Sequence, residues 1–468
     1  MKNAFNVSVI FLLLFGAFAA TRADSIDDFV NQQIKKRQIP GLSLAVLRDG
    51  KIVKAAGFGL ANVELQVPAT KDTVYEIGSI SKQFASEAAM LLVEEGKIDL
   101  DDSIIKYLPS NAPETWQKIT IRNLLNHTSG LKDWTEIKEF SYRREYSPEE
   151  FIDLVKGFPL TFQPNENWLY SNTNLPLIGI IVEKASGKPF EDFVTERIIK
   201  PLSFPSIRFK HQEDVVANRA AGYVLRNDIW KNGEPFRPKI IAPSGGILSN
   251  AVDLAKWWEA VLQGRVVKQT SLEQMLSPAK INDGRSVAHG FAFFTNTFNG
   301  NKSIFHHGST VGGFGSGVYY FPREKITIAI IANLEDGGFG AEYISKRVAN
   351  SYIPGAFVGG LKEVIDVNKT QTNLQILKAI ADNKTPEILS ANFAAKVSET
   401  FRKQLGENLK QMKSFEYLGR EKIGENHFML DPLAREFFRY KMTLAKREVY
   451  YHFRMNKDGK IGWIIFEE

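Results

Sequence analysis

The 468-residue chain contains no cysteine, and this absence removes three kinds of chemistry at once. Disulfide bridges, thiolate metal sites and cysteine nucleophiles all require the thiol group. Long blocks of one charge are also missing: 59 Lys and Arg residues alternate with 53 Asp and Glu residues, which leaves a net charge of +6. The basic patch typical of nucleic-acid binding is therefore not present, and we expect no nucleic-acid partner.

Long apolar runs are missing too, except at the N-terminus. Lys2 precedes an apolar run over residues 7–20, and Ala19 and Ala23 offer two candidate cleavage positions. A short positive start, an apolar run and small residues at its end are typical of a secretory signal peptide. The run is shorter than the roughly 20 residues that a membrane span needs. We expect residues 1–23 to be removed on export, which leaves a periplasmic or secreted chain without a membrane anchor.

The pattern of apolar runs predicts an α+β fold. Asp49-Gly50 separates apolar runs at 42–47 and 52–56, and such a turn pair between two apolar runs predicts a hairpin. Short helices and loops fill most of 100–240. Further β-rich runs come late in the chain, at 303–306, 317–321 and 326–333. This order predicts one antiparallel sheet built from both chain ends, with a helical insertion between them.

The character of the sequence changes near residue 360. Gly359-Gly360 and the polar stretch 366–373 are typical of a linker. Beyond it, helical patterns are followed by strand-like runs. The expected helices are 374–381, 386–393 and 395–409, and the expected strands are 414–419, 437–444, 448–455 and 461–466. We therefore predict a main domain over 24–358, a linker over 359–373 and a small α+β accessory domain over 374–468.

Ser79 and Lys82 form the first of three short motifs with chemical potential. They open a helical pattern over residues 77–95, and their i, i+3 spacing puts both side chains on one helical face. A serine hydroxyl is a weak nucleophile until a base takes its proton, and a lysine kept neutral by burial can be that base. Taken alone, the four-residue pattern more often marks an N-terminal serine followed by a solvated lysine.

The second motif is Tyr170-Ser171-Asn172, which follows a turn at Pro164. A tyrosine hydroxyl near Ser79 and Lys82 could relay a proton to a leaving group. The amide of Asn172 could hold a substrate carbonyl or orient the lysine. In isolation, the same residues are also what an ordinary loop contains.

The third motif is His306-His307-Gly308-Ser309-Thr310, at the end of an expected strand before a glycine-rich bend. Strand N–H groups and a glycine allow a ligand to approach the backbone closely. Adjacent strand residues point to opposite faces, so the two histidines cannot share one metal ion. The ligand patterns of zinc sites are not found in the sequence, and we expect neither a metal nor another cofactor.

In this order, the three motifs resemble those of the serine β-lactamase and penicillin-binding-protein superfamily, most closely its class C β-lactamase-like branch. Three further segments resemble family signatures: Asn123-Leu124-Leu125-Asn126-His127-Thr128-Ser129-Gly130-Leu131, 162–172 and 242–254. The resemblance covers roughly residues 25–355. It implies a β-lactamase/transpeptidase-like fold and an exported serine hydrolase that works through an acyl-enzyme.

The resemblance also implies roles for the motif residues. Ser79 is the expected nucleophile, Lys82 its base or the base's partner, and Tyr170 the general acid/base. Asn172, His306, Gly308 and Ser309 are the expected substrate-binding positions. The backbone N–H groups of Ser79 and Ser309 are the expected oxyanion hole.

His306 departs from the lysine that begins this triplet in true β-lactamases. A neutral imidazole attracts a carboxylate less than an ammonium group does, and we expect His306 to gain its proton as the pH falls towards 5.5. Asn165, where the family often has glycine, is expected to tolerate a left-handed turn.

The substrate is the least defined part of the prediction. A D-amino-acid peptide or amide is favoured, with β-lactams as inhibitors. A carboxylesterase of the same fold and a non-catalytic penicillin-binding scaffold are the alternatives.

Overall fold

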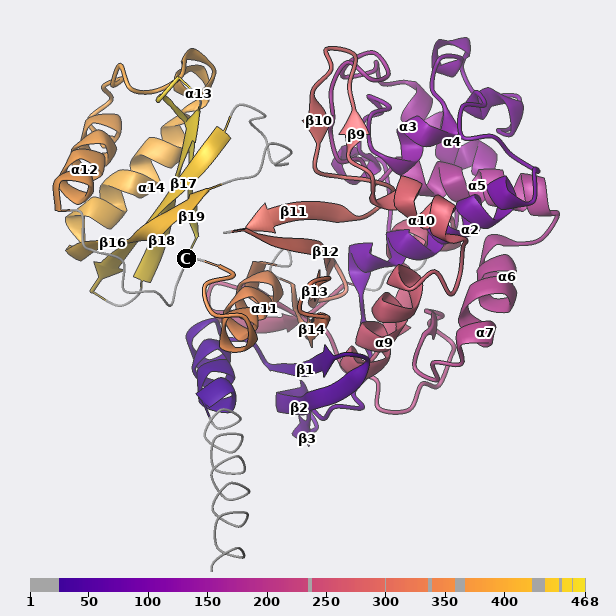
Figure 1. Ribbon diagram of the computed structural model, residues 1–468, viewed down its shortest axis with the longest axis horizontal. Coiled ribbons are helices and arrows are strands. Elements are labelled where there is room, and N and C mark those ends of the chain that lie inside the picture. Colours follow the sequence, from indigo (N-terminus) through magenta and orange to yellow (C-terminus); the bar gives the residue numbers. More distant parts are fainter. Residues whose placement is uncertain are drawn as a thin grey trace, which may run out of the picture. The chain divides into compact units, whose positions relative to one another are not determined.

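The computed structural model describes residues 25–467 apart from 235–237, 299, 336–338, 358–366, 423–433, 446–447 and 457 (Figure 1). The expected signal peptide lies outside the described residues. Within them, no helix combines the length and apolar character that crossing a membrane requires. The described residues divide into two compact units, those within 25–295 and 303–351 and those within 296–302 and 352–467.

A seven-stranded sheet, in the order β11-β12-β13-β14-β1-β2-β3, organises the first unit, although the end of β11 and the start of β12 lie within 296–302 and group with the second unit. Its strands are β1 (Gly41–Arg48), β2 (Lys51–Asn62), β3 (Val67–Pro68), β11 (Phe294–Phe298), β12 (Asn301–Thr310), β13 (Phe314–Phe321) and β14 (Ile326–Ala332). At its centre β1 pairs with β14 (Figure 1), and the register places Ala45 opposite Ala329. The prediction of one antiparallel sheet from both chain ends is therefore confirmed.

The hairpin at Asp49-Gly50 forms as predicted. Both residues have positive φ angles, 49° and 74°, as a two-residue hairpin turn with the twist of the strands requires. All seven residues of β14 are buried, because helices cover both faces of the sheet. Gly317 of β13 packs against α11 (Phe339–Tyr352), and Thr327 of β14 bonds to Glu259 of α9 (Ala251–Leu262) from the other face.

The helical insertion surrounds α2 (Lys82–Glu94), whose residues from Lys82 to Leu92 are all buried. The other helices are α3 (Ile121–Leu125), α4 (Pro148–Lys156), α5 (Asn174–Ser186), α6 (Phe190–Val194), α7 (Lys200–Leu202), α8 (Ala242–Gly245) and α10 (Gln269–Leu276). The short strands outside the main sheet are β4 (Tyr75–Glu76), β5 (Arg208–Phe209), β6 (Tyr223–Arg226), β7 (Ile229–Asn232), β8 (Ile247–Ser249), β9 (Ala279–Lys280), β10 (Ser286–Val287) and β15 (Leu334–Glu335). The insertion thus encloses the first turn of α2, where Lys82 lies.

The second unit is a four-stranded antiparallel sheet with three helices. Its elements are α12 (Val367–Ala381), α13 (Ala391–Lys396), α14 (Glu399–Lys410), β16 (Met412–Lys422), β17 (Ala434–Leu444), β18 (Glu448–Asn456) and β19 (Ile461–Glu467). Leu377, Leu405, Tyr440 and Tyr451 belong to its buried core.

Part of the predicted linker is helical. Residues 367–373 form the first half of α12, whereas 359–366 lie outside the described residues. The polar run has the composition of a linker because it supplies the polar first half of a helix whose later residues Leu377 and Ile380 are buried. Asn373 from this run also donates a hydrogen bond to the hydroxyl of Tyr440. The helix predicted over 386–393 is displaced along the chain, since α13 begins at Ala391 and ends at Lys396.

Candidate active site

Ser79 lies in the short 3₁₀ helix η1 (Gly78–Ser81), directly before α2, and its side chain is only partly buried. The turn sits against β12 at very close range. A Cβ atom added to Gly308 would lie 2.2 Å from the carbonyl oxygen of Ile77 and 2.8 Å from the nitrogen of Ser79. A Cβ atom on Gly78 would lie 2.7 Å from the nitrogen of Ser309. The two glycines therefore let the backbones of Ser79 and Ser309 lie side by side.

Lys82 is fully buried at the start of α2, and its Nζ atom contacts three oxygen atoms. The Ser79 Oγ atom is 2.9 Å away, the Asn172 Oδ1 atom 2.8 Å away and the carbonyl oxygen of Ser244 3.0 Å away. The i, i+3 spacing that suggested a shared face thus produces a direct contact between the serine and the lysine.

Burial lowers the pKa of Lys82 to about 7, and the Asp133 carboxylate opposes this shift. A neutral amine has two N–H donors and one lone pair. Asn172 Oδ1 and the Ser244 carbonyl oxygen can only accept, so they take the two N–H groups. The lone pair then faces the Ser79 hydroxyl at 2.9 Å, the arrangement in which the amine can take the hydroxyl proton.

Asp133 fixes the orientation of Asn172. One carboxylate oxygen of Asp133 accepts hydrogen bonds from the Asn172 backbone N–H at 2.9 Å and from its Nδ2 atom at 2.8 Å. Because Nδ2 is held there, Oδ1 is the atom that faces Lys82. Asp133 is the N-cap residue of the short helix η4 (Trp134–Glu136) and was not identified from the sequence.

The ring of Tyr170 packs beside the lysine, with its centroid 5.0 Å from Lys82 Nζ. Its buried hydroxyl lies beside the Ser79 hydroxyl, and no group in the described part of the chain forms a hydrogen bond of standard geometry with it. Burial raises the pKa of Tyr170, and the Ser79 hydroxyl only partly offsets this effect. The phenol therefore remains protonated near neutral pH and is able to donate a proton.

His306 belongs to β12 and is 1% exposed, and its ring centroid is 6.3 Å from that of Tyr170. Its Nδ1 atom is 2.6 Å from the carbonyl oxygen of His307. A carbonyl oxygen only accepts, so Nδ1 carries the hydrogen and Nε2 the lone pair. Burial lowers the pKa of His306 well below its ordinary value. The expectation that His306 gains a proton as the pH falls towards 5.5 is therefore wrong.

The structure also tests the expectations for His307, Asn165 and a metal ion. The side chain of His307 is on the opposite side of β12 from His306, with its Nδ1 atom 3.8 Å from Glu342 of α11. Asn165 has a φ of 64°, so the left-handed turn predicted for it is confirmed. Within the described residues, no group of three His, Asp or Glu side chains is arranged to hold a metal ion.

A serine at the start of a buried helix, a lysine one turn later and a glycine-bearing strand against the serine define a β-lactamase-fold serine hydrolase. The profile of the Beta-lactamase family matches residues 26–352, and the chain belongs to this family.

Relatives extend this assignment. Protein flp of Staphylococcus aureus (strain MRSA252) is 27% identical over 328 residues, which cover 69% of this chain and 64% of that protein. The chain thus spans less than two thirds of the length of this relative. D-amino acid amidase from Ochrobactrum anthropi SV3, solved with L-phenylalanine amide, has a TM-score of 0.61 at 25% identity and covers 71% of this chain and 99% of its own.

A third similarity includes the second unit. The octameric penicillin-binding protein homologue from Pyrococcus abyssi has a TM-score of 0.61 at 23% identity, and the match covers 95% of this chain and 100% of that one. At this identity the likeness concerns the fold alone.

Proposed function

We propose that this protein hydrolyses small amides or peptides of D-amino acids through an acyl-enzyme on Ser79. The observation that carries the proposal is the contact between Lys82 Nζ and Ser79 Oγ at 2.9 Å, made by a buried lysine with a pKa of about 7. A lysine of this kind is a general base near neutral pH.

Acylation begins when neutral Lys82 takes the Ser79 proton as Oγ attacks the substrate carbonyl carbon. A C–O bond forms, and the carbonyl π electrons move to the oxygen. The N–H groups of Ser79 and Ser309 are the donors proposed to stabilise this oxyanion, and one such donor is worth about 3–4 kcal/mol in comparable enzymes.

The tetrahedral intermediate collapses when the C–N bond breaks and the leaving amine takes a proton from Tyr170. The proton held by Lys82 then returns to the tyrosinate, which restores both groups. In deacylation, water attacks the ester carbon and gives up a proton to the same pair of groups. Ser79 leaves as the alcohol, and the product acid departs.

The neutral state of His306 supports an amide substrate over a carboxylate-bearing one. A substrate group that reaches the lone pair on Nε2 has to be a hydrogen-bond donor, as an amide N–H is. A lysine at this position would instead attract a carboxylate. The amidase named above, solved with an amino-acid amide, supports the same class. An ester is the second candidate, since the acyl-enzyme chemistry does not require a leaving amine.

Covalent labelling tests the enzymatic proposal against a non-catalytic scaffold. A fluorophosphonate and a fluorescent penicillin should each modify Ser79, as mass spectrometry of the peptide would show, and Ser79→Ala should abolish both labelling and turnover. A chelator should leave turnover unchanged. Failure of wild-type labelling by both probes, or loss of turnover that added metal restores, would contradict the proposal.

A substrate comparison then separates the amide from the ester. D-amino-acid amides, nitrophenyl esters and a cephalosporin should be ranked by kcat/KM, each against the Ser79→Ala background. We expect the D-amides to lead and the cephalosporin to acylate Ser79 with little turnover. We also propose that the protein acts in the periplasm or outside the cell, as the predicted signal peptide suggests. N-terminal sequencing of the exported protein should begin at residue 20 or 24.

A further inference from the structure

The buried residue His127 contacts the Tyr170 segment in three independent ways. The carbonyl oxygen of His127 accepts a hydrogen bond from the Leu169 N–H at 3.1 Å. Its Nδ1 atom accepts one from the Ser171 N–H at 3.2 Å. Its ring stacks on the ring of Tyr170, with centroids 4.4 Å apart and planes 25° apart. One residue therefore binds the backbone on both sides of the tyrosine and also packs against its ring.

The protonation state of His127 suits this role. Nδ1 also lies 3.0 Å from the amide nitrogen of Asn174, whose Oδ1 atom already accepts from Ser129 at 2.8 Å. Two donors therefore converge on Nδ1, which must present a lone pair, so the hydrogen is on Nε2. Burial keeps the ring neutral by lowering its pKa well below the ordinary value.

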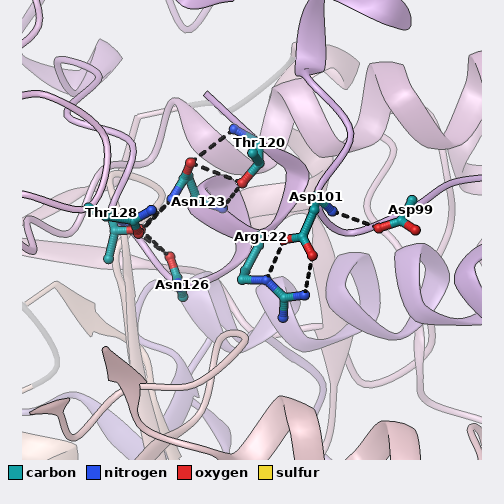
Figure 2. A network of polar contacts seen from close by, with 8 residues as sticks. Asp99, Asp101, Thr120, Arg122, Asn123, Asn126 and Thr128 are labelled. Atoms are coloured by element: carbon teal, nitrogen blue, oxygen red, sulfur yellow. Dashed lines mark hydrogen bonds and ion pairs between the residues drawn. The ribbon is translucent and has the colours of Figure 1, made fainter. Parts of the chain in front are cut away.

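The turn that holds His127 is itself fixed. Thr120 and Asn123 form a reciprocal cap at the start of α3, in which the Thr120 hydroxyl accepts from the Asn123 N–H and Asn123 Oδ1 accepts from the Thr120 N–H (Figure 2). Thr128 joins Asn123 to Asn126 through its hydroxyl at 2.8 and 2.7 Å. His127 lies between residues of this network and has a φ of 60°, in the left-handed region that residues other than glycine rarely adopt.

We propose that His127 is a positioning residue for Tyr170, which fixes the height and tilt of the phenol above Lys82. The proposal rests on the proposed function, because it assumes that Tyr170 donates the proton to the leaving group. A left-handed backbone at a histidine is unfavourable, and the fixed turn holds the conformation in which the carbonyl oxygen contacts Leu169, Nδ1 contacts Ser171 and the ring stacks on Tyr170.

Two variants separate the contacts. His127→Asn keeps a side-chain acceptor close to the position of Nδ1 and a residue that tolerates a positive φ, but it loses the ring. His127→Phe keeps a ring for stacking and loses the acceptor for the Ser171 N–H. With the p-nitroanilide of a D-amino acid as the probe, whose leaving amine needs a proton, and rates divided by the fraction of Ser79 labelled by fluorophosphonate, we expect His127→Phe to lower kcat at least tenfold with KM within twofold. His127→Asn should retain kcat within threefold.

A double-mutant cycle provides the readout that a merely structural role would not give. If His127 acts through Tyr170, both variants should change kcat less than twofold in a Tyr170→Phe background. His289→Asn is the matched control, because the His289 ring is equally buried and its centroid lies 5.0 Å from that of His127. It should leave kcat per labelled site within twofold.

Each outcome decides the proposal. Equal losses of kcat in the wild-type and Tyr170→Phe backgrounds would overturn the positioning role and leave the proposed function intact. The same conclusion would follow if His127→Phe lowered only the fraction of Ser79 that is labelled and left kcat per labelled site unchanged. A loss in His289→Asn as large as that in His127→Phe would show that packing alone is responsible, and would also overturn it. Wild-type protein that fluorophosphonate does not label would overturn the function and the positioning role together.

Discussion

Lys82 is an ionisable residue in a fully buried position, and its surroundings determine the pH range in which it can act as a base. Since burial lowers its pKa to about 7, the amine is mostly protonated below that pH and mostly neutral above it. We expect kcat/KM for a neutral substrate to rise as the pH increases through about 7, tenfold for each pH unit on the acid side. Rates measured from pH 5 to 9 test this expectation.

An arginine at the same position provides the control for the pH profile. Lys82→Arg keeps a positive charge but cannot become neutral in this range, so it should lose turnover at every pH. A wild-type profile that is flat between pH 5 and 8 would show that Lys82 is not the titrating base.

Asp133 affects the same titration from a distance. Its negative charge raises the pKa of Lys82, so Asp133→Asn should lower that pKa and move the acid side of the profile to lower pH. The Asn172 amide would also lose its charged acceptor, and we expect kcat to fall about tenfold, or about 1.4 kcal/mol. Glu136→Gln, an exposed acid in the same turn, should change neither quantity. A shift towards higher pH would contradict the assigned role.

For single residues, the sequence predicted the members of the candidate site better than the groups that hold them in place. Ser79, Lys82, Tyr170 and Asn172 were all singled out, and the structure brings them together. Asp133 and Ser244 were not predicted, because only tertiary folding brings the Asp133 carboxylate and the Ser244 carbonyl to the site. The one available signal for Asp133 was its place directly after the 123–131 signature. His127 was named only as part of the 123–131 signature, with no role of its own.

Among the elements, the tight contact between β12 and the nucleophile turn is the most sensitive to added volume. Gly308→Ala would place a methyl group 2.2 Å from the Ile77 carbonyl oxygen, so strand and turn have to separate. We expect a loss of about 1–3 kcal/mol in the free energy of unfolding and a larger loss of kcat, because the Ser309 N–H moves with the strand. Thermal unfolding and kinetics measure the two effects.

Gly157→Ala is the matched control for this substitution. It lies at the end of α4 with a negative φ of −70°, and an added Cβ atom would meet nothing within 4 Å. Stability and turnover should both stay close to those of the wild type. A Gly308→Ala variant with unchanged kcat would indicate that the strand does not contribute to the oxyanion site.

Helix α2 carries a second buried ionisable group, Glu87, for which neither carboxyl oxygen has a hydrogen-bonding partner in the described part of the chain. Burial raises its pKa well above 4.5, with a smaller contribution from Glu94. The folded state therefore keeps a proton that the unfolded state releases. Stability from this group is present below pH 4.5 and is lost as the pH rises towards the folded pKa.

Replacing the acid by its neutral amide tests this sign. Between pH 5 and pH 8, the Tm of Glu87→Gln should fall less than the Tm of the wild type. The variant lacks the carboxyl group that binds a proton more tightly in the folded state than in the unfolded state. The exposed residue Glu273 of α10, changed to Gln, should leave the wild-type difference unchanged. A larger pH dependence in Glu87→Gln than in the wild type would contradict the prediction.

Elements with strong local signals were predicted well. The 49–50 turn and the alternation of apolar runs were enough for β1, β2, β13 and β14. The helix expected over 77–95 is instead η1 followed by α2, because the close approach of β12 shapes the turn at Ser79. The polar run at 367–373 was misassigned because a solvent-facing helix and a linker have the same composition when read without their packing.

For the molecule as a whole, every residue of the candidate site belongs to the first compact unit. A chain that ends after Phe357 should therefore still be labelled at Ser79 by a fluorescent penicillin. Ending it after Ser351 should lower Tm, since the ring of Phe298 would lose that of Phe357, 5.0 Å away. A chain ending at 357 that folds but cannot be labelled would show that the second unit takes part in the site.

The pairing of β1 with β14 also has a consequence for how the protein folds during its synthesis. Leu42 lies opposite Ala332, so the centre of the sheet joins segments from nearly opposite ends of the first unit. Contacts between such distant segments slow folding, because a long loop must close before they contribute. A nascent chain that has emerged only as far as α5 already carries Ser79, Lys82 and Tyr170 but has no β12 to set beside the serine. Reactivity should appear late and in a single step, when the last strands of the sheet are synthesised.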